Sequence, residues 1–173
     1  MSLVLIDSDT VSSPTGTVDL TGIDSTYNVY KIVANNVKVS ADDALSIRVE
    51  KSGSAQTDSE YDDAKNYVKA DAAFAASASG TGRDQIDFTA TIDSGDADAN
   101  GNGVAHLFCF SNASEYSFLT VESVHFQYNV DAARGFTGGF VHTVASASDG
   151  VLFKTNGGNN ITAGTFKLYG IKK

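Results

Sequence analysis

Cysteine, proline and tryptophan are almost missing from this sequence of 173 residues, which has one cysteine, one proline and no tryptophan. A disulfide needs two cysteines, so none can form within the chain. The single thiol, Cys109, lies in the apolar run 107–110, and we expect it to be buried in the core.

Positive charge is also scarce, since 12 Lys and Arg residues face 21 Asp and Glu residues, for a net charge of −9. Binding to nucleic acid or to an anionic membrane relies on Lys and Arg, so we expect neither as a partner. No stretch approaches the ~20 apolar residues of a membrane span. The first residues lack the basic and apolar regions of a signal peptide, and we expect synthesis in a cytoplasm.

Motifs of enzyme active sites are missing as well. The sequence has no G-x-S-x-G, no H-E-x-x-H and no phosphate-binding glycine loop followed by a helix. The histidines, His106, His125 and His142, each lie in an expected strand, without the spacing of metal ligands. We therefore expect no catalytic residue, no enzymatic activity and no organic cofactor.

Short alternating apolar segments are what the sequence has in abundance, and 16 glycines with many Asn, Asp and Ser separate them. Alternation with a period of two is typical of half-buried strands, and these polar residues and glycine favour turns. About ten strands in one chain predict an all-β sandwich. The expected strands are 3–6, 15–20, 28–33, 37–39, 45–50, 85–92, 104–110, 118–130, 138–146, 151–154 and 164–171.

The segment 60–76 is ambiguous, because its alanines with Tyr61, Ala64 and Val68 fit a helical spacing. Its surroundings favour a strand near residues 66–74. We expect 52–59 and 77–83 to be loops.

The loop 93–103 contains a candidate cation site. Asp96, Asp98, Asn100 and Gly101 match the first half of a calcium loop, in which alternating oxygen ligands wrap a hard cation. The twelfth position of that motif is Leu107 instead of a glutamate. Asp, Asn and Gly are equally typical of plain turns. The pattern thus predicts at most a weak calcium site formed by Asp96, Asp98 and Asn100.

Tyrosines and uneven charge are two further features. Acidic residues concentrate between residues 7 and 98 while the last third is mildly basic, which indicates solvated loops or attraction between copies. Tyrosines on a surface can stack on sugars, although core and interface roles are their commoner use. The tyrosines in question are Tyr27, Tyr61, Tyr67, Tyr116 and Tyr128.

Three blocks of the sequence resemble one protein group. The chain ends in a glycine turn and Gly-Thr-Phe-Lys-Leu-Tyr-Gly-Ile-Lys over 164–172. Residues 20–30 read Leu-Thr-Gly-Ile-Asp-Ser-Thr-Tyr-Asn-Val-Tyr, and residues 103–112 place a Leu-Phe core before a Ser-Asn turn. In order and approximate spacing, these blocks resemble small tail-associated or capsid-decorating proteins of tailed, especially marine, bacteriophages.

The resemblance implies a single jelly-roll β-sandwich domain over residues 1–173. It also implies a non-enzymatic structural protein on the virion exterior, at the head or the tail, that forms a homo-oligomer, with a trimer favoured. Its partners would be other virion proteins. A receptor-binding module for host surface glycans and a polysaccharide depolymerase are the alternatives.

Overall fold

Thirteen strands and no helix make up the residues that the computed structural model describes, 2–70, 77–128 and 132–172. Alternating residues of most strands are buried, as the sequence pattern predicts. The strands are β1 Leu3–Val11, β2 Thr17–Thr21, β3 Val29–Val39, β4 Asp43–Lys51, β5 Ser54–Ala55, β6 Tyr61–Lys69, β7 Ser77–Arg83, β8 Ile86–Ile92, β9 Gly101–Phe108, β10 Ser117–Gln127, β11 Ala132–His142, β12 Gly150–Thr155 and β13 Ile161–Ile171.

Eight of these strands form a jelly roll, so the expected fold class is confirmed. The chain folds back on itself as a long antiparallel ribbon, in which β1 pairs with β13, β2 with β12, β3 with β9, and β4 with β8. The ribbon then rolls up, because β13 also pairs with β3 and β12 with β4. Successive strands therefore alternate between two layers, which is the jelly-roll arrangement.

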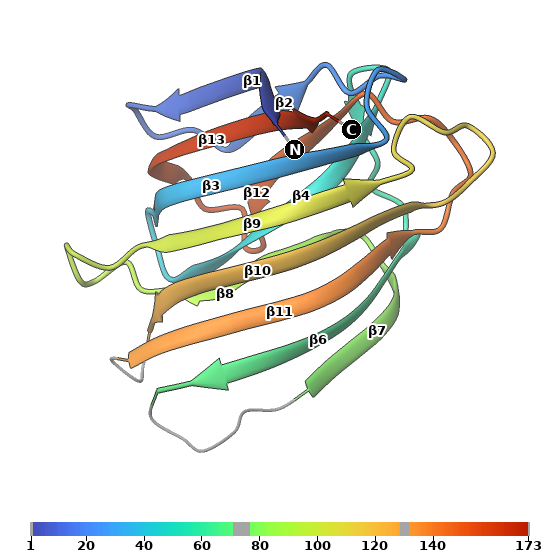
Figure 1. Ribbon diagram of the computed structural model, residues 1–173. Coiled ribbons are helices and arrows are strands. Elements are labelled where there is room, and N and C mark those ends of the chain that lie inside the picture. Colours follow the sequence, from blue (N-terminus) through green and yellow to red (C-terminus); the bar gives the residue numbers. More distant parts are fainter. Residues whose placement is uncertain (1, 71–76, 129–131, 173) are drawn as a thin grey trace.

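Two excursions of the chain widen one layer. The β10–β11 hairpin adds to β9, and the β6–β7 hairpin adds to β11. The larger sheet has the order β1-β13-β3-β9-β10-β11-β6-β7, and the smaller sheet has the order β8-β4-β12-β2. In Figure 1 the larger sheet faces the viewer and the smaller sheet lies behind it. One residue pair, Gln127 of β10 with Ile92 of β8, connects the larger sheet to the smaller sheet.

The core lies between the two sheets. Phe153 of the smaller sheet contacts Phe166 of the larger sheet, with ring centroids 4.9 Å apart, and meets Phe88 edge-on at 5.3 Å. Such contacts bury the inward residues of both layers. The largest side chains that are fully buried are Tyr30, Tyr61, Phe88, Phe110, Phe153 and Phe166.

Three expectations from the sequence were wrong in detail. Residues 77–83, expected to be a loop, form the edge strand β7, and the loop 52–59 contains the short strand β5. The expected strands 28–33 and 37–39 are one strand, β3. Asn35 and Asn36 lie within it, at a shift of register between Ala34 and Val37. Asn36 takes a positive φ of 55° there, a conformation that asparagine tolerates.

Other strand boundaries moved by several residues. The strand expected near 66–74 is β6, which begins at Tyr61 and ends at Lys69, and residues 71–74 of that expectation lie outside the described residues. The ends of the expected strands 118–130 and 138–146 are also wrong. β10 ends at Gln127, with 129 and 130 outside the described residues, and β11 runs from Ala132 to His142.

Cys109 is not a core residue. It follows β9 in a turn, with a positive φ of 63°, and its side chain is only partly buried. A hydrogen bond with Glu115, together with burial, raises the pKa of its thiol. The thiol is therefore not activated as a nucleophile.

Candidate functional site

The loop with the calcium candidates is organised by its own hydrogen bonds. Oδ1 of Asp96 accepts a hydrogen bond from the backbone N–H of Asp98 at 2.8 Å, and Nδ2 of Asn100 donates to the carbonyl of Asp98 at 3.2 Å. Leu107 is fully buried in the core. In the described part of the chain, no three His, Cys, Asp or Glu side chains gather as metal ligands. The weak calcium site at Asp96, Asp98 and Asn100 stays a prediction.

The three histidines do not meet. His106 is on the outer face of β9, whereas His125 and His142 are buried on the inner face of the sheet. His142 lies opposite Ser117 in the β10–β11 pairing, eight residues from His125 along β10, which corresponds to roughly 27 Å. Burial lowers the pKa of both buried imidazoles, to about 4 for His125.

The tyrosines do not form one stacking platform. Tyr61 is fully buried, and Tyr67 is partly buried with its ring edge-on to Phe136. Tyr116 and Tyr128 are exposed, but they flank opposite ends of β10. Burial raises the pKa of Tyr61 to about 12, and its hydroxyl donates to the carbonyl of Gln56, as a core tyrosine does.

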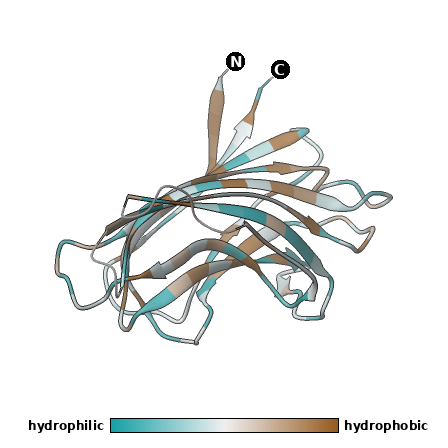
Figure 2. Cartoon of the chain, turned by 90° about the horizontal axis from the view of Figure 1, so that it is seen from below, coloured by the Kyte–Doolittle hydropathy of each residue, from teal (hydrophilic) through white to brown (hydrophobic). Residues whose placement is uncertain are grey.

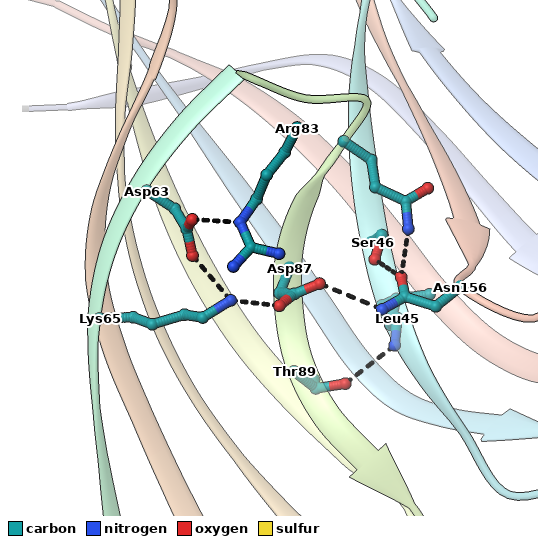
Figure 3. Close-up of polar contacts among 9 residues, drawn as sticks. Leu45, Ser46, Asp63, Lys65, Arg83, Asp87, Thr89 and Asn156 are labelled. Atoms are coloured by element: carbon teal, nitrogen blue, oxygen red, sulfur yellow. Dashed lines mark hydrogen bonds and ion pairs between the residues drawn. The ribbon is translucent and has the colours of Figure 1, made fainter. Parts of the chain in front are cut away.

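An ionic cluster lies between the two sheets, and Figure 3 shows its side chains pointing toward one another. Lys65 of β6 is buried, with its Nζ 2.7 Å from Oδ2 of Asp63 and in contact with Asp87 of β8. The buried carboxylate of Asp63 also contacts Nε of Arg83. Lys65 thus joins the larger sheet to the smaller one.

The charge of Lys65 is maintained by these partners. Burial alone lowers the pKa of its ammonium group, but the hydrogen bonds to Asp63 and Asp87 outweigh burial and raise it. A protonated lysine in two ion pairs has no lone pair for nucleophilic chemistry. The arrangement is suited to holding the two sheets in register.

Amide side chains continue the cluster toward solvent. Nδ2 of Asn156 donates to Asp87 at 3.1 Å, and Oδ1 of Asn156 accepts from Nε2 of Gln85 at 2.7 Å. Ser46 also donates to Asn156. Gln85, Asp87 and Asn156 line a polar hollow of about 300 Å³ together with Arg83.

The outer face of the larger sheet is the other candidate surface, because no described element packs against it (Figure 1). The strand pairings place side chains on this face in rows that cross the strands. The first row consists of partners on β1 and β13 and partners on β3, β9, β10 and β11, and its member on β13 lies one residue beyond Gly170, the last residue of that strand paired with β3. Its six members are all apolar: Leu3, Ile171, Val29, Phe108, Phe118 and Val141.

Three members of this row are exposed, and Ile171, Val29 and Val141 are half-buried. Phe108 is 36% exposed, Phe118 47% and Leu3 50%. An exposed contiguous apolar row of this kind marks an interaction surface in a soluble protein.

The next two rows are mixed. One carries Lys31 of β3 and His106 of β9, and the other carries Lys167 of β13 and Glu122 of β10. Both lysines lie on the β1 side of the boundary between β3 and β9, and Glu122 lies on the other side. The remaining members of these rows are Leu5, Tyr169, Thr120 and Gly139 in the first, and Ser8, Val33, Val104 and Thr137 in the second.

Comparison of the sequence with family models, with curated proteins and with solved structures gives no match. The described part of the chain holds no helix long and apolar enough to cross a membrane.

Neither surface was found from the sequence. Lys65 and Asp87 are 22 residues apart, and only the pairing of β6 and the position of β8 bring them together. The alternation in 118–130 predicted a strand there. It gave no sign that five more strands add apolar residues to Phe118 in one row.

Proposed function

We propose that this protein is a non-enzymatic structural component of a tailed-phage virion, which acts by assembly on the particle exterior. The observation that carries the proposal is the uncovered outer face of the larger sheet, with its row of exposed apolar side chains. The resemblance of the three sequence blocks supports the phage setting. A virion protein of this kind is expected to bury such a face against copies of itself or other virion proteins, and a trimer is the expected oligomer.

Two measurements test this proposal. Light scattering at micromolar concentration is expected to give a multiple of the chain mass of 18.1 kDa. Antibody-labelled virions imaged by electron microscopy are expected to carry the protein on the head or the tail. A protein that stays monomeric and is missing from particles would contradict the proposal.

A second candidate function is recognition of host surface glycans. The polar hollow favours it, because Arg83, Gln85 and Asn156 offer donors and acceptors of the kind that bind sugar hydroxyls. A glycan array tests it, with Asn156→Ala as the variant expected to lose binding. The third alternative from the sequence is a polysaccharide depolymerase. A depolymerase would release reducing sugar from host polysaccharide, and the glycans that bind on the array are the substrates to test.

A further inference from the structure

The outer face of the larger sheet is raised on one side. The ends of β1 and β13 near the termini stand out from the body of the sandwich on the side of this face (Figure 2). Leu3 and Leu5 lie on this raised ribbon and are 50% and 53% exposed. Figure 2 colours the first part of β1 as hydrophobic. A pair of leucines held clear of the body is an apolar projection that needs a partner.

The same face is hollowed on its other side. Phe108, Phe118 and Val141 line a depression of about 690 Å³ that also contains Gly139. A side chain at Gly139 would meet no atom within 4 Å, so the depression is open at this point. β1, which carries the projection, is the third strand on one side of the boundary between β3 and β9. β11, which lines the depression, is the third strand on the other side.

We propose that the larger sheets of two copies of this chain pack face to face, about a two-fold axis that follows the boundary between β3 and β9. The inference deepens the proposed function, on which it rests, by naming the assembly face and the partner. A rotation of 180° about this axis places β1 of one copy over β11 of the other, and β13 over β10. The projection of each copy then enters the depression of its partner, as an isologous contact requires.

The rows of the face match under this rotation. Leu5 of one copy meets Gly139 of the second copy, where there is room for it. Lys167 meets Glu122 of the second copy, so the contact brings two opposite-charge pairs together. Val33 meets Val104 near the axis. The aliphatic residues thus meet apolar residues or glycine, and Lys167 meets an anion. In the second row Lys31 meets His106, and Tyr169 meets Thr120.

Charge and size favour a second copy as the occupant. The chain has a net charge of −9, yet the three rows carry Lys31 and Lys167 against Glu122 alone, so these rows do not add to the repulsion between two acidic copies. Six strands and three rows span about 29 Å by 20 Å, which gives roughly 1,200 Å² for both copies together. This area is at the lower limit of specific interfaces.

A charge exchange across the two-fold axis tests the contact by sedimentation velocity. Glu122→Lys and Lys167→Glu are each expected to raise the dissociation constant at least tenfold, because each places like charges together. The double variant restores the pairs with the charges exchanged. Its dissociation constant is expected to lie within about threefold of that of the unaltered protein. Asp19→Lys, on the smaller sheet, makes the same charge change as Glu122→Lys and is expected to leave association unchanged.

Gly139→Leu provides an independent test, since the open space at Gly139 accepts a side chain without disturbing the fold. The added side chain occupies the space that Leu5 of the second copy needs. It is expected to leave a monomer in place of a dimer, or a trimer in place of a hexamer, while the melting temperature is kept. The contact requires an even number of copies, either a dimer or two trimers joined into a hexamer. An even-numbered assembly that survives Gly139→Leu, a double charge variant as weak as the single ones, or an unaltered protein that forms an isolated trimer would overturn the inference. A protein that is monomeric in every form would contradict the proposed function itself.

Discussion

His125 is the single residue whose protonation is most strongly coupled to folding. It is 2% exposed, and its ring nitrogens have no hydrogen-bond partner among the described residues. Burial lowers the pKa of its imidazole to about 4, whereas an unfolded histidine titrates near 6.5. The unfolded chain therefore binds the extra proton between these two pH values, and stability falls as the pH falls through this range.

We expect the free energy of unfolding to fall by about 2 kcal/mol because of His125 when the pH is lowered from 7.5 to 5. Urea unfolding at both pH values measures this loss. His125→Phe is expected to show a smaller loss of stability over the same interval, whatever its stability at pH 7.5. Equal pH dependence of the two proteins would mean that the imidazole is not held neutral in the fold.

Lys65 is the residue that holds the two sheets together by charge. Lys65→Met removes one of the two cations that pair with the buried Asp63 and leaves it with Arg83 alone, so we expect a loss of about 3 kcal/mol in the free energy of unfolding. Arg48→Met is the matched control, since the partner of Arg48 is the exposed Asp84 and the expected cost is below about 1 kcal/mol. Chemical denaturation of both variants at pH 7 makes the comparison, and similar costs would refute the assignment.

Among the elements, β13 is a strand paired on both sides, with β1 on one side and with β3 on the other. Phe166 and Leu168 of this strand are fully buried, although Ile171 lies on the outer face. We expect deletion of residues 164–173 to give insoluble or molten protein, because β1 loses its strand partner, β3 keeps only β9, and the core loses Phe166 and Leu168. Near-ultraviolet circular dichroism reports the loss of packing, and deletion of 172–173 alone is the control that keeps it.

The loop between β8 and β9 is the second element whose behaviour can be tested. Its side-chain oxygens already accept hydrogen bonds from the loop, including Oδ1 of Asp93 from the N–H of Gly95 at 2.7 Å. We therefore expect millimolar calcium to leave the melting temperature unchanged. An increase that Asp96→Ala with Asp98→Ala removes would instead establish the weak cation site.

The whole molecule carries its acidic charge away from the face that we assign to assembly. Copies with a charge of −9 repel one another at long range, while the proposed contact is largely apolar. Salt screens the repulsion and leaves apolar contacts in place. Raising sodium chloride from about 0.05 M to about 0.5 M is expected to increase the associated fraction in sedimentation velocity. Weaker association at high salt would mean that the Lys167–Glu122 pairs dominate the contact.

The sequence determined the strands with clear alternation. Ile47 and Val49 of β4 and Phe88 of β8 are buried at the positions that period two predicts, because alternate side chains of a strand point to opposite faces. Turn residues likewise indicated an all-β chain. Boundaries were poorer where small residues dominate, as in β7, since Ser-Ala-Ser-Gly-Thr-Gly has no apolar period.

Only the tertiary structure decided which strands are neighbours. The jelly-roll order joins β1 to β13 across nearly the whole chain, and no local pattern encodes such a pairing. The pairing of β9 with β10 places Phe108 beside Phe118 on the outer face. The pairing of β6 with β11, together with the position of β8, brings Lys65 to Asp87 in the interior. Local sequence sets which face of a strand is apolar. The register between distant strands sets what those faces build together, and that register depends on packing of the entire core.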